Sequence, residues 1–324
     1  MLPATELGAA RPATAKNLYV ANVYANSVTV YAPGTSSPLR TITDGVSRPY
    51  AICFDSEGYL YVANFGSTTI TVYAPGSTKV LRTISTDVDA PTAVAVDSSA
   101  NVYVANLGNN TVTVYKAGTS DLLQVIVHGV KQPERLAFDG SGKLYVVDWL
   151  PGSSALAGSV TIYRADASRT LLRTLTDGIH HPVSIALDAS NNLYVGNIVS
   201  GTGNVEVYAP RQSKPGKKIT NGILWPEALA FDPSGNLYVA NYASVSTLHN
   251  SVTVYSAGKT SLLRTISTGV EGPLSLAFGS SGYLNVGNIG PGYGSITEYP
   301  PNSGKLSRTI TKGINDPVSI AFGP

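Results

Sequence analysis

The chain is poor in the residues that mark several common classes of protein. One cysteine in 324 residues excludes an intrachain disulfide and a cysteine-rich metal site. Only 13% of the residues are charged and the net charge is +2, too little to support a nucleic-acid-binding face. No run approaches about 18 apolar residues, so no membrane-spanning helix is expected.

Motifs of the common catalytic classes are missing as well. The chain has no G-x-S-x-G or H-E-x-x-H run, and the glycine-rich stretch 201–203 does not lead from a strand into a helix. The single thiol, Cys53, lies in an apolar segment where the other repeats carry Ala, and we expect it to be buried and unreactive. No motif therefore identifies an activity.

The chain does contain a sevenfold repeat with a unit of about 42 residues. The segment Leu-Tyr-Val-Ala-Asn occurs three times and in variant form four times, at 18–22, 60–64, 237–241, 102–106, 144–148, 193–197 and 284–288. A repeat of this length indicates an array in which each unit is stable only when packed against its neighbours.

Each unit is predicted to form four short strands, which we call A to D. In the second unit these are 50–55, 59–64, 69–74 and 80–85, separated by Asp-Ser-Glu-Gly and Ala-Pro-Gly turns. Helical periodicity is absent throughout. The sequence therefore predicts an all-β fold, a seven-bladed β-propeller with four antiparallel strands per blade.

The two ends of the repeat array predict how the ring closes. Residues 17–324 form one propeller domain that begins with a strand B at 17–22 and ends with a lone strand A at 318–322. The last strand is expected to complete the first blade, which leaves no open edge. Residues 1–16 are expected to be a linker or a processed N-terminal segment. A surface rich in Thr, Ser, Asn and Gly favours an exported protein, in the periplasm, outside the cell or on its surface.

Strands A and D carry two further patterns. Strand A alternates small and large apolar residues, so large faces are expected to pack on the small faces of the next blade. Strand D carries a basic residue in every unit except the third, where Gln124 stands. A basic outer rim is one explanation, and protection of the outer blade edge from pairing is the favoured one.

Departures from the repeat point to one face of the ring. The spacing from the Asn or Asp that ends strand B to the Tyr that ends strand C is 9, 9, 9, 15, 11, 14 and 11 residues. The loops between strands B and C are therefore longer in blades four to seven. They are expected to share a face with the loops that lead into strand A, a usual place for binding residues. Neutral variation in tolerant loops is the alternative.

Blade four departs most from the repeat. Arg135 stands where the other six blades have Ala or Ser, Glu134 precedes it, and Asp148 replaces an Asn. Trp149 follows, and then the longest insertion, 150–159. An arginine at the channel mouth must be paired or solvated. It either forms an ion pair with a nearby carboxylate or belongs to a site for an anionic or polar ligand.

Other candidate residues are expected near the same rim. The ligand-binding candidates are Arg135, Glu134, Asp148, Trp149, Trp225, Glu227, His181 and Tyr50. The metal-ligand candidates are Glu134, Asp148, Asn197, Glu227 and Asn241. Trp225 could stack on a sugar ring or cover a blade interface. His181 and the adjacent His180 are favoured as loop residues, and the Asn that recurs in six blades is favoured as a structural group that bonds local backbone.

The run Pro-x-Ala-x-x-Phe-Asp-x-x-Gly-x-Leu-Tyr-Val-Ala-Asn at Pro226–Asn241 resembles the repeat of NHL and YVTN-type propellers. It is also similar to the SMP-30/gluconolactonase-like group. Lactonases of that group bind a divalent cation at the channel mouth through Glu, Asp and Asn. The resemblance to virginiamycin B lyase propellers implies His and Glu in the blade loops, but here His180 and His181 precede Pro182.

Two functions remain open from the sequence. The favoured one is an exported, monomeric ligand-binding or scaffold propeller whose binding face, centred on blade four, takes a small polar molecule, a glycan or a protein. The alternative is a lactonase-like hydrolase or lyase that uses Glu134, Asp148 and Glu227 around a divalent cation, Ca²⁺ or Mg²⁺.

Overall fold

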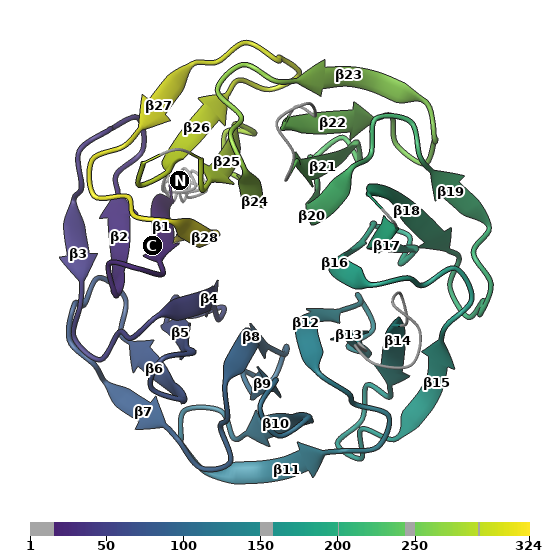
Figure 1. The fold of residues 1–324 in the computed structure, drawn as a ribbon. Coiled ribbons are helices and arrows are strands. Elements are labelled where there is room, and N and C mark those ends of the chain that lie inside the picture. Colours follow the sequence, from purple (N-terminus) through teal and green to yellow (C-terminus); the bar gives the residue numbers. More distant parts are fainter. Residues whose placement is uncertain (1–15, 150–157, 200, 244–249, 291) are drawn as a thin grey trace, which may run out of the picture.

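The computed structural model shows a closed ring of seven blades around a central channel (Figure 1). It describes residues 16–149, 158–199, 201–243, 250–290 and 292–324. Within these ranges the 28 strands form seven four-stranded antiparallel sheets, and no residue is helical. The predicted fold class is confirmed. None of the described segments is a helix that could cross a membrane.

The first four blades follow the predicted order of strands A to D. Blade 1 consists of β28 (Pro317–Gly323), β1 (Asn17–Asn22), β2 (Ser27–Tyr31) and β3 (Arg40–Ile42). Blade 2 consists of β4 (Pro49–Phe54), β5 (Leu60–Asn64), β6 (Thr69–Tyr73) and β7 (Arg82–Ile84). Blade 3 consists of β8 (Pro91–Val96), β9 (Val102–Asn106), β10 (Thr111–Tyr115) and β11 (Leu122–Ile126). Blade 4 consists of β12 (Pro133–Phe138), β13 (Leu144–Trp149), β14 (Gly158–Tyr163) and β15 (Leu171–Leu175).

The last three blades repeat this order. Blade 5 consists of β16 (Pro182–Leu187), β17 (Leu193–Val199), β18 (Thr202–Tyr208) and β19 (Lys217–Ile219). Blade 6 consists of β20 (Trp225–Phe231), β21 (Leu237–Tyr242), β22 (Ser251–Tyr255) and β23 (Leu262–Ile266). Blade 7 consists of β24 (Pro273–Phe278), β25 (Leu284–Asn288), β26 (Ser295–Tyr299) and β27 (Arg308–Ile310).

The ring closes through the two ends of the described chain, as the sequence predicts. Strand β28 pairs antiparallel with β1, with Asn17 opposite Gly323 and Ala21 opposite Ser319. The Tyr19 hydroxyl also donates a hydrogen bond to the carbonyl of Pro324 at 2.7 Å. Main-chain pairing between the first and last strands of the described chain therefore completes blade 1, and β28 covers the inner edge of β1.

Strand D is shorter than predicted in the second blade. Strand β7 covers Arg82–Ile84, whereas the sequence pattern predicts 80–85. Leu81 still donates its amide to the carbonyl of Val72 at 2.8 Å. The main-chain pairing therefore continues one residue past the regular strand.

The hydrophobic core is divided among the blade interfaces. One cluster joins Tyr19, Ala21 and Val28 of blade 1 to Ile52 and Val62 of blade 2. The next cluster places the small face of β4 against blade 3, as the alternation in strand A predicts. Cys53 of this face is half-buried there, and desolvation of its thiol raises its pKa to about 12 and keeps it protonated.

A contact between aromatic rings recurs at the blade interfaces. The Tyr in the second position of strand B meets, edge to face, the Phe that ends strand A of the next blade. The ring centroids are 4.8–5.0 Å apart in four pairs, Tyr19–Phe54, Tyr103–Phe138, Tyr194–Phe231 and Tyr238–Phe278. These pairs connect successive blades near the end of the channel opposite the long loops.

The recurrent arginine of strand D lies over the same tyrosine of its own blade. The guanidinium carbon is 5.6 Å from the ring centroid for Arg40 on Tyr19, and 5.9 Å for Arg264 on Tyr238. Arg264 also donates a hydrogen bond to the Tyr238 hydroxyl at 2.8 Å. The arginine thus contributes a cation–π contact inside the blade, a role that the edge-protection hypothesis did not include.

Blade 3 has Gln124 in place of this arginine, and blade 4 supplies a substitute. Arg169, from the turn between β14 and β15, is buried and lies 4.9 Å from the Tyr103 ring centroid. Its Nε donates to the Tyr103 hydroxyl at 2.8 Å, and its Nη2 pairs with Asp97 at 3.2 Å. A guanidinium therefore occupies the same place in both cases, although it comes from the next blade.

Arg169→Ala is expected to lower the free energy of unfolding by about 3–5 kcal/mol, because it leaves the buried Asp97 carboxylate without its partner. Urea denaturation of the two proteins measures the difference. Arg164→Ala is the matched control, because Arg164 lies in the same turn but is exposed with its partner Asp166. Equal midpoints for the two variants would show that the inter-blade ion pair does not stabilise the ring.

Candidate functional site

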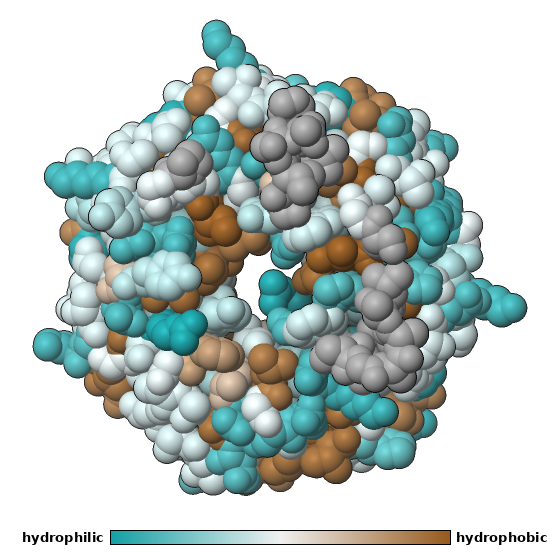
Figure 2. Space-filling model, viewed as in Figure 1, coloured by the Kyte–Doolittle hydropathy of each residue, from teal (hydrophilic) through white to brown (hydrophobic). Residues whose placement is uncertain are grey.

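The strand register places the candidate residues on one face of the ring. In blade 4 Pro133, which begins strand A, pairs with Asp148 near the end of strand B, and the equivalent pair occurs in every blade. The loops between strands B and C therefore lie beside the loops that lead into strand A, as predicted. We call this side the channel face, and Figure 2 shows that it is hollowed at its centre.

A cavity of about 220 Å³ lies in the channel and is lined by strand A of all seven blades. Most of the lining is small or apolar, for example Ala51, Ala93 and Ser184. The two charged side chains in the lining are Arg135 and Glu227, which come from blades 4 and 6. The charge of the channel is thus concentrated on one side.

Arg135 pairs with Glu134 and lines the same cavity as Glu227, and we call these three side chains the charged group. Its Nη1 lies 3.6 Å from a Glu134 carboxylate oxygen and donates to the Glu134 carbonyl at 3.0 Å. Burial raises the pKa of Glu134, and the Arg135 charge opposes that shift. Burial also raises the pKa of Glu227, Arg135 opposes this, and Glu134 adds to it. The three side chains therefore share one electrostatic environment.

Asp148 lies apart from this group and has a structural partner set. It is fully buried, and its Oδ1 accepts the amide of Lys131 at 2.9 Å. Its Oδ2 accepts the hydroxyls of Thr161 at 3.0 Å and Ser159 at 3.4 Å. The other six blades have Asn at this position, and its carbonyl oxygen accepts a loop amide in the same way. In five of them the amide lies 17 residues earlier in the chain, and in the first blade it is that of Asn315.

The proposed metal ligands do not form a common donor set. Asn197 accepts the amide of His180, and Asn241 accepts that of Leu224, each at 3.1 Å, so both carbonyl oxygens are engaged like those of Asp148. No group of three or more His, Cys, Asp or Glu side chains in the described ranges could hold a metal ion. Of the five candidates, Glu134 and Glu227 alone lie in the charged group, and a divalent cation there would compete with Arg135.

Three aromatic pairs stand on the channel face. Trp149 stacks on His181, with ring centroids 4.9 Å apart and an interplanar angle of 11°. Burial lowers the pKa of His181, which favours the neutral ring. The other pairs are Tyr50 with Phe65 at 5.0 Å, and Trp225 with Tyr242 at 5.9 Å. These partly exposed rings offer flat apolar surfaces beside the polar channel mouth.

Two of these aromatic residues were not among the candidates from sequence. Phe65 and Tyr242 follow the Asn of strand B directly, as Trp149 follows Asp148. The other four blades have an aliphatic residue at this position. An aromatic residue in three of the seven blades was therefore the sequence feature that could have marked Phe65 and Tyr242 as candidates. The inserted loops 150–157 and 244–249 lie outside the described residues.

Burial raises the pKa of Asp148 to about 7, from an ordinary value near 4. Between about pH 4 and 7 the folded protein keeps a proton that the unfolded chain has lost, so stability should fall with rising pH across this window and level off above it. Asp148→Asn removes this titration. We expect that variant to show a flatter profile and to exceed the wild type in stability at pH 8, measured by urea denaturation.

Asn106→Asp places the same carboxyl in blade 3 and serves as the matched variant, because Asn106 is equally buried and bonds the amide of Asp89. The free energy of unfolding of this variant should fall more steeply with rising pH than that of the wild type over the same pH window. Coincident pH profiles for wild type and Asp148→Asn would show that Asp148 stays ionised in the folded protein.

Comparison with known proteins identifies the fold and leaves the family open. No protein-family model matches the chain, and no curated protein matches it in sequence. One similar structure is a protein of Bacteroides fragilis assigned provisionally as a 6-phosphogluconolactonase, with a TM-score of 0.73 and 15% identity over 97% of this chain and 100% of that one.

Two further structures agree with this one. A protein of unknown function from Desulfotomaculum acetoxidans has a TM-score of 0.76 and 14% identity, covering 95% of this chain and 99% of its own. A protein from Lactobacillus plantarum has a TM-score of 0.72 and 16% identity, with 95% and 99% coverage. At these identities the likeness establishes the propeller fold and no activity.

Proposed function

We propose that this protein is a binding propeller that takes a small, uncharged, hydroxyl-rich molecule of the sugar class at the mouth of its channel. The observation that carries the proposal is the pair of charged side chains in the channel lining, Arg135 and Glu227, with Glu134 paired to Arg135. The rest of the lining is uncharged and mostly small or apolar. An isolated charge group of this kind costs desolvation energy and adds little to the packing of the blades.

The chemistry of the group favours hydroxyl ligands. Arg135 supplies several N–H donors in a fixed plane, and the two carboxylates accept hydrogen bonds from hydroxyl groups. When both carboxyls are ionised, one positive charge faces two negative charges, so an anionic ligand would add repulsion. A neutral polyol can both accept from the guanidinium and donate to the carboxylates.

The size and walls of the site agree with a sugar of one or two rings. The cavity of about 220 Å³ is below the range of about 300–1,000 Å³ that is usual for a complete small-molecule pocket. A ligand would therefore extend from the channel onto the channel face. There the stacked pairs Trp149–His181 and Trp225–Tyr242 present rings on which the apolar face of a sugar can lie.

A hydrolase is the second candidate, and one observation favours it. Burial raises the pKa of both Glu134 and Glu227, and Glu134 adds to the shift of Glu227, a pattern found in carboxyl pairs that act as acid and base. The name given to the Bacteroides fragilis protein suggests a sugar lactone as the substrate to try first. Binding without turnover is the simpler function for the geometry, because three of the five residues expected to hold a catalytic metal, Asp148, Asn197 and Asn241, bond loop amides instead.

The binding proposal is tested by calorimetric titration of glucose, galactose, mannose and N-acetylglucosamine. Arg135→Ala should lower the affinity for the sugar by roughly tenfold or more, because a hydrogen bond to a charged group contributes about 1.5–3 kcal/mol. The unfolding midpoint should change little, since the Arg135 side chain is 38% exposed. Lys131→Ala, an exposed cation of the same blade, is the control and should bind as the wild type does.

The outcomes separate the two functions and a structural role. If δ-gluconolactone is hydrolysed with Mg²⁺ or Ca²⁺, and Glu134→Gln and Glu227→Gln both abolish turnover, the hydrolase replaces the binding proposal. If Arg135→Ala destabilises the fold and Arg135→Ala/Glu134→Gln restores it, with sugar binding unchanged, Arg135 only neutralises its neighbours. Failure of every sugar to bind the wild type would overturn the proposal.

A further inference from the structure

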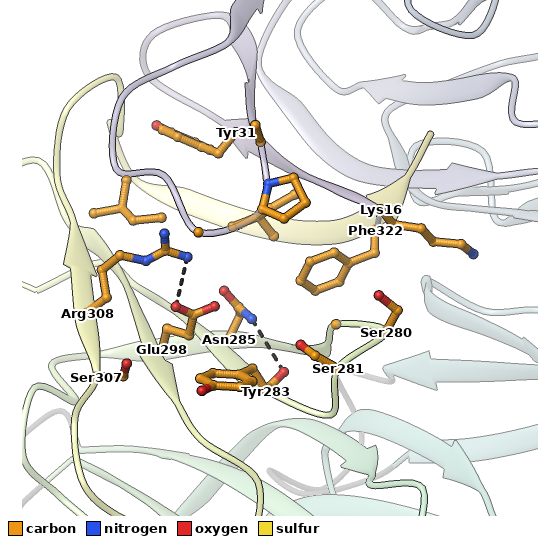
Figure 3. A pocket seen from close by; sticks show the side chains of 16 residues that line it. Lys16, Tyr31, Ser280, Ser281, Tyr283, Asn285, Glu298, Ser307, Arg308 and Phe322 are labelled. Atoms are coloured by element: carbon orange, nitrogen blue, oxygen red, sulfur yellow. Dashed lines mark hydrogen bonds and ion pairs between the residues drawn. The ribbon is translucent and has the colours of Figure 1, made fainter. Parts of the chain in front are cut away.

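A second cavity lies away from the charged group, between blades 7 and 1. It has a volume of about 510 Å³ and is lined by the A–B turn of blade 7, at Gly279–Tyr283, and the C–D turn of blade 1, at Ala32–Gly34 (Figure 3). These turns lie at the strand ends opposite the channel face. The cavity is therefore separate from the site of the proposed function, and an inference drawn from it stands independently.

The cavity is present because blade 7 lacks two side chains of the repeat. Asn285 stands at the second position of strand B, where the six other blades have Tyr, and Gly279 stands where blades 2 to 6 have Asp. In blades 2 and 3 that Tyr donates its hydroxyl to that Asp, at 3.0 and 3.1 Å. A phenol ring and its carboxylate partner are thus both missing at one place.

Phe322 is left without the aromatic partner that its equivalents have. Strand A ends in Phe in five blades, and in the other four the preceding blade provides a Tyr ring at 4.8–5.0 Å. Among the described rings Phe322 has no such partner, and it lines the cavity together with Asn285. The cavity therefore lies where the repeat places a tyrosine ring, and Phe322 forms part of its wall.

The polar groups around the vacancy are arranged for a hydroxyl. Arg308 is the strand-D arginine of blade 7, and with no Tyr beneath it, it pairs with Glu298 at 2.8 Å. The other blades have Val or Ile at the Glu298 position. Among the described residues, Arg308 has no hydrogen-bond partner at Nε or at Nη1, and both atoms are buried. The strand-D arginines of blades 1, 2 and 6 lack a described partner at Nε alone. Asn285 is 2% exposed, and its amide reaches the Tyr283 carbonyl only at 3.5 Å.

We propose that this cavity binds a small molecule bearing a hydroxylated aromatic ring, with the ring against Phe322 and the hydroxyl between Arg308 and Glu298. The ring restores the edge-to-face contact that the other interfaces make within the chain. The hydroxyl accepts a hydrogen bond from the guanidinium, as the Tyr238 hydroxyl does from Arg264, and donates one to the carboxylate. Space beyond one ring remains for a substituent that leaves past Ser280 and Ser281 (Figure 3).

A random loss of packing would leave a different cavity. A large-to-small change that served no ligand leaves an apolar hole, and such holes stay dry and cost stability. Here the substitution comes with a buried carboxamide, a carboxylate in place of an aliphatic residue and a partner-free guanidinium nitrogen. Polar groups of this kind are costly when buried and become satisfied when a ligand hydroxyl binds.

The probe is p-cresol, which is the tyrosine side chain itself, and binding is measured by saturation-transfer NMR and calorimetry. We expect saturable binding of p-cresol to the wild type, and binding weaker by roughly tenfold for toluene, which lacks the hydroxyl. Cyclohexanol, which lacks the aromatic ring, should also bind more weakly. Equal affinity for p-cresol and toluene would overturn the assignment of Arg308 and Glu298.

Two variants connect binding to this cavity. Asn285→Tyr with Glu298→Val rebuilds the sequence of the other blades, so it should abolish p-cresol binding and raise the unfolding temperature. Phe322→Leu keeps an apolar side chain but removes the ring, and it should weaken p-cresol binding while the protein stays folded. Arg135→Ala, on the channel face, is the control and should bind p-cresol as the wild type does. Absence of binding to the wild type, or unchanged binding in both cavity variants, would overturn the proposal.

Discussion

The geometry of the channel face depends on one buried hydrogen-bond group in each blade. The carboxamide at the end of strand B, or the Asp148 carboxyl in blade 4, accepts the amide of the loop that leads into its own blade. In five blades the carboxamide also donates to the hydroxyl of a Thr on strand C. A buried amide left unpaired would cost about 1–3 kcal/mol, so each loop is fixed where it crosses the rim. The strand-A residues that follow, including Glu134 and Glu227, therefore start from fixed loops.

A second constraint acts at the opposite end of the strands. There a Tyr of one blade, a Phe of the next and an arginine above them join neighbouring blades. The interface requires a guanidinium at this place, whichever blade provides it, because Arg169 of blade 4 replaces the arginine that blade 3 lacks. Where no residue replaces the missing Tyr, at Asn285, a cavity of about 510 Å³ remains.

The sequence could predict the fold because the repeat itself carries the fold. Alternation in strand A, turn residues at fixed offsets and a lone last strand are local signals, and the ring follows from repeating them. The unusual residues of blade 4 could also be recognised from the sequence, because the other six blades show what the repeat normally has there. One of them, Arg135, does line the channel. Their partners could not be read, because contacts such as Arg169 with Asp97 join residues 72 positions apart. The role of Asp148 also required knowledge of its burial, since the same carboxyl on an exposed rim would be a candidate metal ligand.

Two departures from the repeat show why burial decides the meaning of a substitution. Asp148 replaces Asn with a side chain of the same shape, so no space opens and the change appears as a raised pKa. Asn285 replaces Tyr with a much smaller side chain, so space opens beside Phe322 and the nearby arginine takes a new partner. In a closed ring neither blade can move away to absorb the change, because each is held on both sides. A polar change that keeps the side-chain shape, as at Asp148, therefore changes the pKa of the group. A change that reduces the side-chain volume, as at Asn285, leaves a cavity that a ligand can enter. For this reason the change at Asn285 says more about binding than the change at Asp148.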